Sequence, residues 1–496
     1  MSAALSNTAS VRRKVVAKSF RDFEAIGKQI VRFGKMTPEN FMRHFRANPS
    51  DHFCSLPHPE GKGSIFCGHI AWKKFDNLAN TLIEYAPELD KRVDLDNVRK
   101  IIRETYVRRI LHDKILLNSN STEDILSEVT EKLKGSLGTT QHLYSCVLFY
   151  NGSPDEFQVG PVIFTRSPIF IRKNRLKIRS SVEESIASHI EKSIEHQARN
   201  HKSTNPQEIE IHARKYVRGL YAQALKTYRS YPWVAQVEIK KCDKVTSDVC
   251  AARTIDAALH VIRILLGARN AERIRLARSR GDALRTADMW IDESGILGVR
   301  ISSRSIGPVG FSNWHDGLMQ IDGYELNLLG SAISVLANPQ TVFHLHQRVL
   351  DGIHWFGDAA TEPEFTSQII KYTSGIERLI FGKFKKGQKM RFANRLKAVC
   401  KAFGCDTDDK VHGDALEVYK TRSALLHGDY SPRHDNVRLI ASKAENLCRL
   451  CILCLIQLYP AILAKFNDVD SEHLESIMDD ITEDADKALM KCGVFV

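Results

Sequence analysis

Helix-length apolar repeats separated by short capping signals are the feature that most limits how this chain can fold. After Asn338-Pro339 the apolar spacing predicts five helices in close succession, near 339–357, 362–382, 388–403, 411–427 and 436–463. Helices joined by such short connections usually pack as antiparallel neighbours. The sequence therefore predicts an all-α bundle over residues 338–465.

The residues before this bundle differ in the period of their apolar positions. Residues 1–137 have mainly helical spacing and are expected to form a helical N-terminal region. Residues 138–337 combine long helices with strand candidates and are expected to form an α+β domain. The strand candidates are Leu143–Tyr150, Val159–Phe164, Trp233–Lys240, Ile296–Ser302 and Gly317–Leu329. The predicted fold class is a predominantly helical α+β multidomain protein that ends in an acidic tail over residues 466–496.

The bundle contains one residue spacing with a clear chemical use, Arg422 and His427 in the segment TRSALLHG. Histidine titrates near neutral pH and acts as an acid or a base, whereas arginine holds phosphate oxygens in a planar fork of donors. The pair suits RNA cleavage without a metal, in which the 2′-OH attacks the adjacent phosphorus. The same spacing also fits a solvated arginine and a histidine favoured by the dipole at a helix C-terminus.

The segment resembles the Apea-like branch of the HEPN superfamily, in which an arginine–histidine motif follows a tyrosine-containing helix and runs into a glycine. Tyr419 and Gly428 occupy those places here. The resemblance extends upstream over His354–Lys383, where Glu377 matches an acid of the family, and downstream over Ala441–Tyr459. It covers about 120 residues, roughly a quarter of the chain.

This resemblance implies a HEPN-type helical bundle, a homodimer across the motif, and endoribonuclease activity that needs no cofactor. Arg422 would stabilise charge on the phosphate and His427 would move protons, while Glu377 and Ser423 would orient them. Such an enzyme would be a stress or anti-phage defence effector, a toxin whose upstream domains bind a trigger or an inhibitor. Because some members of the superfamily are inactive, a non-catalytic nucleic-acid- or nucleotide-binding protein is the alternative. A third class is an interaction protein whose basic charge is incidental.

The distribution of charge supports a polyanionic partner, which we expect to be RNA. Formal net charge is +12, and eight cations with no acid lie between Lys383 and Lys401. The RNA-contacting residues predicted from this run are Lys385, Lys386, Lys389, Arg391 and Arg395. The alternative is a solvated helix face. From Asn467 to Asp486 there are nine acids and no Lys or Arg, so the tail is expected either to dock on the basic run or to form a solvated helix.

One histidine–cysteine cluster has the residue types of a zinc site. Cys54, His58, Cys67 and His69 lie within sixteen positions, but their spacing matches no standard finger. Buried cysteines and loop histidines explain the same residues, so zinc is the weaker interpretation. The eleven cysteines follow no secreted pattern, and the sequence shows no signal segment and no run of membrane-spanning length. These features favour a cytoplasmic protein without a membrane partner.

Overall fold

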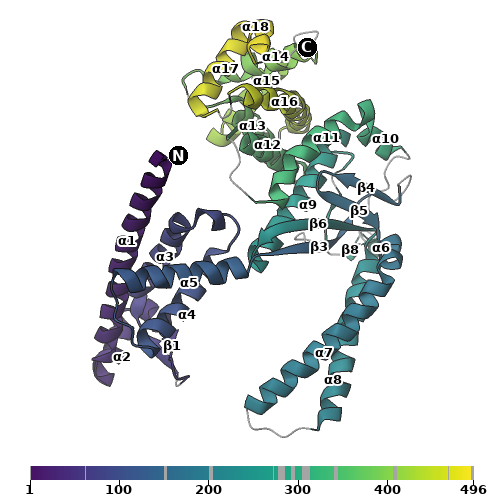
Figure 1. Cartoon of the computed structure of the whole chain (residues 1–496). Coiled ribbons are helices and arrows are strands. Elements are labelled where there is room, and N and C mark those ends of the chain that lie inside the picture. The colour runs from purple at the N-terminus through teal and green to yellow at the C-terminus, as the bar shows by residue number, and fades with distance from the viewer. Residues whose placement is uncertain are drawn as a thin grey trace. The chain divides into compact units, whose positions relative to one another are not determined.

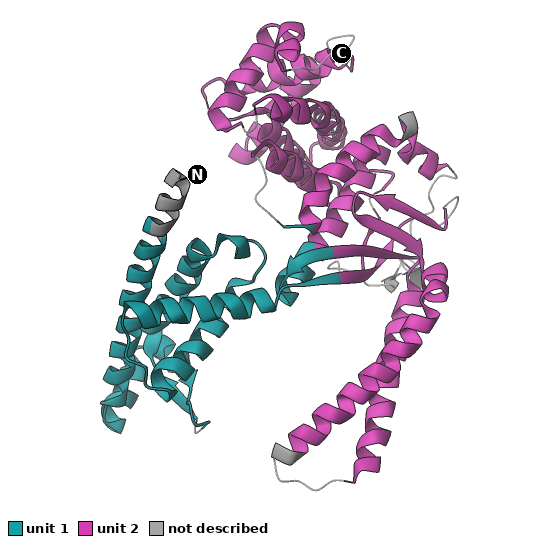
Figure 2. Ribbon diagram, viewed as in Figure 1, with its two compact units in different colours: residues 1–140, 239–250, 338–341 teal, residues 141–238, 251–337, 342–496 magenta. Residues whose placement is uncertain are grey.

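The structure is a computed structural model of the chain. It describes residues 2–61, 63–149, 154–199, 205–271, 273–277, 285–291, 297–303, 313–339, 344–383, 385–405, 410–466 and 469–492. The described residues are mainly helical, with short strands between the helices (Figure 1). They form two compact units, coloured separately in Figure 2. The first unit comprises residues 1–140, 239–250 and 338–341, and the second comprises residues 141–238, 251–337 and 342–496.

Five helices and a small hairpin make up most of the first unit. The elements are α1 (Ser2–Gly34), α2 (Pro38–Ala47), β1 (Ser55–Pro57), β2 (Ser64–Phe66), α3 (Gly68–Tyr85), α4 (Leu95–Tyr106) and α5 (Ser119–Gly135). The side chain of Thr37 accepts a hydrogen bond from the backbone N–H of Asn40 and so caps α2. In the core, the rings of Phe23 and Tyr106 stack with their centroids 5.5 Å apart. This unit is helical, as the apolar spacing predicted.

A five-stranded sheet in the order β4-β5-β6-β3-β7 is the main sheet, and its β4–β5, β5–β6 and β3–β7 pairs are antiparallel. Its strands are β3 (Gly138–Val147), β4 (Glu156–Val159), β5 (Val162–Arg166), β6 (Trp233–Cys242) and β7 (Arg275–Leu276). The alternating segment from Trp233 is a strand, as predicted. The strand predicted over Val159–Phe164 is instead a hairpin, because Gly160 has φ +55 and turns the chain between β4 and β5.

Residues 313–337 contain helices where a strand was predicted. The prediction over Gly317–Leu329 is wrong, because α10 (Trp314–Leu318) and α11 (Gln320–Ser334) occupy this part of the chain. Leu326, Leu329 and Ile333 are buried and recur at helical spacing, which was the signal for α11. The two-stranded sheet of β8 (Arg285–Ile291) and β9 (Leu297–Ser303) agrees with the strand predicted from Ile296.

One close contact fixes α11 against the β4–β5 turn. A Cβ atom on Gly160 would lie 2.3 Å from the carbonyl oxygen of Gly330, which is a backbone atom of α11. A Cβ atom on Gly330 would likewise lie 2.7 Å from the backbone nitrogen of Gly160. The backbones of these two segments therefore approach each other at two glycines, where neither residue has a side chain.

Two long helices form an antiparallel hairpin beside α6. The elements are α6 (Ser167–Lys173), α7 (Arg175–Arg199), α8 (Pro206–Ser230) and then α9 (Lys244–Leu266) after β6. The side chain of Asn205 accepts a hydrogen bond from the N–H of Gln207, and Pro206 occupies the first turn, as the sequence of this cap suggests. Hydroxyl groups of Ser185 and Tyr221 lie 3.1 Å apart across the hairpin.

The C-terminal bundle contains all five helices predicted for it. They are α12 (His344–Ala360), α13 (Phe365–Ile380), α14 (Gln388–Ala402), α15 (Lys410–His427) and α16 (Val437–Phe466). Two further helices follow, α17 (Ser471–Glu483) and α18 (Ala485–Cys492). The acidic segment therefore folds into helices, and α17 packs against α14.

Helix α16 is the most apolar helix of the bundle. Over the described residues it is the single helix that is long and apolar enough to cross a membrane: it has 30 residues and contains an 18-residue window with a mean hydropathy of 2.0. This corrects the expectation that no segment reaches that length. More than half of the apolar window, 56%, is buried inside the protein, as in the core helix of a folded bundle.

The bundle is attached to the C-terminal end of α9. The guanidinium of Arg449 on α16 donates to the carbonyl oxygens of Ile264 and Leu265, the second at 2.8 Å. Gly357 on α12 faces His260 on α9 so closely that a Cβ atom there would lie 1.9 Å from the ring. These contacts order the end of α9, whose last carbonyl groups would otherwise lack partners.

Candidate functional site

Helix α15 carries Arg422, Ser423 and His427, three of the four predicted catalytic residues. Its buried face, which includes Val418 and Thr421, turns toward the bundle. Arg422 is half-buried, and His427 is exposed as the last residue of the helix. Gly428 follows in the left-handed region with φ +81, a conformation that favours glycine and ends the helix.

The fourth predicted residue, Glu377 on α13, contacts the arginine. The guanidinium of Arg422 donates to a carboxylate oxygen of Glu377 at 3.2 Å, and both side chains are 23% exposed. The same guanidinium lies over the ring of Tyr419, 5.7 Å from its centroid. Burial, followed by the charge of Glu377, raises the pKa of the Tyr419 hydroxyl. The structure thus brings Arg422, Glu377 and Tyr419 together.

The imidazole of His427 is not part of that contact. Helix α15 is regular as far as His427, and positions five apart lie about 140° apart around a regular helix. Among the described residues, no hydrogen bond or ion pair joins the imidazole to a partner. The same holds for the hydroxyl of Ser423, so neither side chain is held against Arg422. One chain presents the guanidinium and the imidazole on different sides of the helix end.

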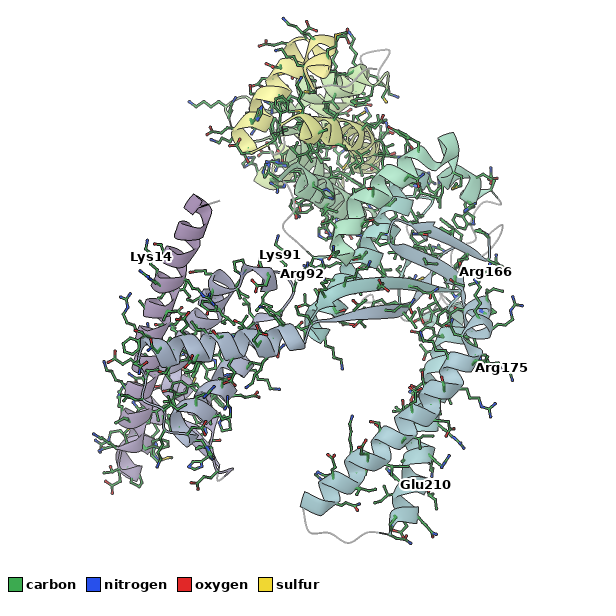
Figure 3. All side chains as sticks on the ribbon, in the orientation of Figure 1. Lys14, Lys91, Arg92, Arg166, Arg175 and Glu210 are labelled. Carbon is green, nitrogen blue, oxygen red and sulfur yellow. The ribbon has the colours of Figure 1, made fainter. Side chains whose placement is uncertain are left out.

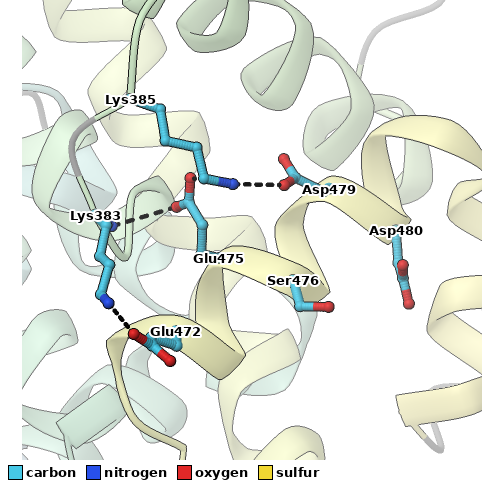
Figure 4. Close-up of a pocket in the computed structure, with 7 residues that line it drawn as sticks. All are labelled: Lys383, Lys385, Glu472, Glu475, Ser476, Asp479 and Asp480. Carbon is cyan, nitrogen blue, oxygen red and sulfur yellow. Dashed lines mark hydrogen bonds and ion pairs between the residues drawn. The ribbon is translucent and has the colours of Figure 1, made fainter.

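Three of the five predicted RNA-contacting residues, Lys385, Arg391 and Arg395, pair with acids of α17, and Figure 4 shows Lys385 beside Asp479. The ammonium of Lys385 lies 3.2 Å from a carboxylate oxygen of Asp479, and Lys383 pairs with Glu472. Arg391 and Arg395 both pair with Glu475, the second with an N–O distance of 2.9 Å. Lys386 and Lys389 are exposed and form no ion pair with a described residue.

Arg395 does not lie on the surface, where a contact with RNA would require it. Its side chain is 1% exposed, and it donates to the carbonyl oxygen of Ile380 at 2.8 Å as well as to Glu475. Arg391 is 20% exposed and pairs with the same carboxylate. The two arginines are therefore internal counter-ions in this fold. A buried guanidinium needs such a partner, because an unpaired charge in a protein interior is strongly unfavourable.

Glu475 is the acid on which this cluster depends. Its side chain is 4% exposed, and it also accepts a hydrogen bond from the backbone N–H of Gly382 at 2.9 Å. Burial alone would raise the pKa of Glu475, but hydrogen bonds from Arg395 and Arg391 outweigh it and lower the pKa to about 2. The carboxylate is thus charged at every pH at which the protein would normally work.

A small hollow lies at the edge of the cluster between the two lysines and α17. Its volume is about 420 Å³, and its lining residues are Lys383, Lys385, Glu472, Glu475, Ser476, Asp479 and Asp480. Charges of both signs face it, and most of them already pair with each other across it. The lining has four acids and two lysines, but Glu475 and Asp479 also pair with Arg395, and Asp480 pairs with Lys491, so the excess of acids already has counter-ions.

The four residues considered for zinc do not form a metal site. Among the described residues, no three His, Cys, Asp or Glu side chains are grouped so that they could hold a metal ion. The thiols of Cys54 and Cys67 are buried and donate to backbone carbonyl oxygens. Burial raises the pKa of the Cys67 thiol to about 12. His58 accepts from the N–H of Glu60 in a turn.

Sequence reasoning missed the pairing between Glu475 and the two arginines. Both charge runs are visible in the sequence, and docking of the acidic segment was one of two expectations. The signal that identifies Glu475 is its position among Leu474, Ile477 and Met478, which are buried on the inner face of α17. An acid on the apolar face of an amphipathic helix needs a buried cation as its partner.

Comparison of this chain with protein-family models, with curated proteins and with solved structures found no match. The likeness to HEPN proteins therefore rests on the motif in α15 and on the helices around it.

Proposed function

We propose that the C-terminal bundle is a metal-independent endoribonuclease of HEPN type, with Arg422 and His427 as its catalytic residues. The observation that carries this proposal is the arrangement along α15. A guanidinium held by a carboxylate lies five residues before an exposed imidazole at the helix end. A fixed cation and a free titratable group are the two chemical functions that cleavage by the 2′-OH requires.

In the proposed reaction, the ribose 2′-oxygen forms a bond to the adjacent phosphorus and the bond from phosphorus to the 5′-oxygen breaks. One imidazole takes the proton of the 2′-OH, and a protonated imidazole gives a proton to the leaving 5′-oxygen. The products are a 2′,3′-cyclic phosphate and a 5′-hydroxyl. Arg422 binds the phosphate oxygens as charge builds on them, and Glu377 fixes the guanidinium.

Two proton transfers call for two titratable groups, whereas one chain contributes one histidine to this motif. We therefore propose that the active unit is a homodimer formed through the bundle. A two-fold interface uses the same patch on both subunits, so it would bring two copies of each residue to one seam. It would also remove the difficulty that Arg422 and His427 face different sides of the helix end. In this proposal the enzyme is a cytoplasmic stress or anti-phage effector, and the upstream regions bind its trigger or inhibitor.

The test is RNA cleavage by the purified full chain in the presence of EDTA. Loss of a positioned acid or base lowers a rate by about 10²–10⁴, so His427→Ala should nearly abolish cleavage. His434→Ala is the matched control, because His434 is also exposed and lies in the turn that follows α15. Cleavage by His427→Ala at the wild-type rate would overturn the assignment.

Mixing two inactive chains tests the shared site. An Arg422→Ala chain and a His427→Ala chain should recover a small part of the activity when combined. Each mixed dimer keeps one intact arginine and one intact histidine at the seam, and water would take over the second proton transfer. A chain that sediments as a monomer and still cleaves at full rate would exclude a shared site.

A second candidate is a non-catalytic protein that binds nucleic acid or nucleotides. One observation favours it: among the described residues, no partner orients the imidazole of His427, whereas Arg422 is held in place. This candidate predicts RNA or nucleotide binding that depends on Arg422, with no cleavage in any condition.

A further inference from the structure

Two segments of the second unit contain many cations and no acid. Residues 157–182 include six Lys or Arg and no Asp or Glu, and residues 211–237 include five Lys or Arg and no acid. The first segment passes through β5 and α6 into the start of α7. The second covers most of α8 and the start of β6. Each segment alone would be an ordinary solvated helix face, so their relative position decides their meaning.

The structure places the two segments side by side. Helices α7 and α8 run antiparallel, and the hydroxyl of Tyr221 contacts Ser185, so the start of α7 lies beside the end of α8. The ring of Phe170 on α6 stacks on Tyr228 of α8 with 6.1 Å between centroids. Figure 3 shows Arg175 extending from the start of α7, next to α6. Cations from three helices therefore gather at this end of the hairpin.

Six of these cations are exposed and form no ion pair with a described residue. We name them the basal patch: Arg172, Arg175, Lys177, Arg179, Lys226 and Arg229. Lys173, in the same region, does have a partner, because its ammonium lies 2.9 Å from a carboxylate oxygen of Glu156. The basal patch thus differs from the cations around α14, four of which pair with acids of α17.

Further along the hairpin, acids lie among the cations and pair with two of them. Arg218 pairs with Glu183 at 3.3 Å, and Arg214 pairs with Glu210 at 2.9 Å. Lys192 and Lys215 are exposed there without an ion pair to a described residue, but acids lie on both helices in the same stretch, so positive charge without nearby acids is concentrated at the end of the hairpin beside α6. Confined charge of one sign produces a stronger local potential than the same charge mixed with acids.

We propose that the basal patch binds the phosphate backbone of RNA. The choice of RNA as the polyanion rests on the proposed function, whereas the position of the patch rests on the geometry alone. Four of its six members are arginines, whose planar forks match phosphate oxygens. Exposed, unpaired cations gain affinity for a nucleic acid backbone by releasing its condensed counterions, and this gain does not depend on base sequence. The patch would hold the substrate, while the site on α15 cleaves it.

The test compares two triple variants of the full chain with equal loss of charge. The first is Arg175→Gln, Arg179→Gln and Lys226→Gln in the basal patch. The control is Lys14→Gln, Lys35→Gln and Arg43→Gln, which removes three exposed cations of the first unit that form no ion pair with a described residue. Both triples are made in a His427→Ala chain, so that cleavage does not consume the RNA.

Binding of a fluorescent single-stranded RNA is measured by anisotropy at several salt concentrations. The slope of log K against log salt is negative, and each lost phosphate contact to a single strand reduces its magnitude by about 0.7. The basal triple should therefore reduce the magnitude of the slope by about 2 and weaken binding at low salt by about tenfold or more, whereas the control triple should bind as the parent does. Unchanged binding by the basal triple, or an equal loss in both triples, would overturn the proposal.

Two further arms separate the alternatives. Vesicles that contain anionic phospholipid replace the RNA in the first arm, and patch-dependent binding to vesicles but not to RNA would overturn the choice of ligand. In the second arm, cleavage is measured in chains that keep His427. Patch-dependent RNA binding without cleavage by the wild type would contradict the proposed nuclease and leave this inference standing. If the wild type cleaves RNA and the basal triple changes neither cleavage nor RNA binding, the proposed nuclease stands and this inference is overturned.

Discussion

Replacing Glu475 with glutamine should release α17 from the bundle. The substitution keeps the shape of the side chain but removes the charge that faces Arg395, which is 1% exposed, and Arg391. The new amide group also directs N–H donors toward guanidinium donors. Removing one partner of a buried ion pair destabilises a protein by about 3–5 kcal/mol, because it leaves the other charge unpaired.

The pKa of the same carboxylate gives an independent magnitude. Hydrogen bonds from the two arginines overcome the effect of burial and lower the pKa of Glu475 from 4.5 to about 2. Each pKa unit corresponds to about 1.4 kcal/mol, so the native state favours the charged form by roughly 3 kcal/mol. The two arguments agree on a loss of about 3 kcal/mol for Glu475→Gln.

The sign of the pH dependence follows from this lowered pKa. The unfolded carboxyl binds a proton below about pH 4.5, while the folded one stays charged to about pH 2. Its stabilising contribution is therefore complete above pH 4.5 and is lost as pH falls from 4.5 to 2. In Glu475→Gln this part of the acid dependence should disappear.

Hydrogen exchange followed by mass spectrometry measures the effect in the full chain. A loss of about 3 kcal/mol corresponds to roughly hundredfold faster exchange of α17 amides, where exchange occurs through local opening. Glu472→Gln is the matched control, because Glu472 lies on the same helix but is 73% exposed, and exposed pairs contribute about 0–1 kcal/mol. Equal exchange of α17 in the two variants would refute the reasoning.

Three further predictions concern other parts of the chain. Removing the residues after Phe466 should lower the thermal unfolding temperature of the bundle, because it takes away the counter-ions of Arg391 and Arg395. An unchanged melting curve would show that α17 is not needed for the stability of the bundle. Gly357→Ala should destabilise the protein by about 1–3 kcal/mol in chemical denaturation, because the added Cβ would lie 1.9 Å from His260, and His260→Ala should recover part of that loss. Mass-spectrometric alkylation at mildly alkaline pH should modify the exposed Cys405 well before Cys67, whose pKa burial raises to about 12. Equal labelling of the two thiols would contradict the burial of the second.

The helical bundle could be predicted because its signals are local. Long apolar repeats, proline and glycine at helix ends and short connections all lie within one helix or its neighbour, so α12 to α16 appear where the sequence indicates them. The strand predicted over Gly317–Leu329 was wrong because the spacing of apolar residues was misjudged. The buried residues of α11 recur every three or four positions, as in a helix, rather than every two, as in a strand. Whether a segment forms a helix or a strand can thus be predicted where one spacing of apolar residues dominates.

The environment of the candidate site could be predicted only in part. The match of Glu377 to a family acid brought it into the predicted set, and in the structure it contacts Arg422. The partner of Arg395 could not be identified in the same way, because Glu475 lies 80 residues further along the chain. A pairing between distant charges depends on how helices pack, and neither charge run specifies that packing by itself.

The contact between Gly160 and Gly330 has a consequence for how the protein can change over generations. A larger residue at either position would meet backbone atoms of the other segment, at 2.3 Å in one direction and 2.7 Å in the other. Trimming a neighbouring side chain cannot relieve a collision with a main chain, so no single compensating substitution would rescue such a variant. In a genetic selection for suppressors, changes at these two positions should return only as true revertants or as altered loop lengths.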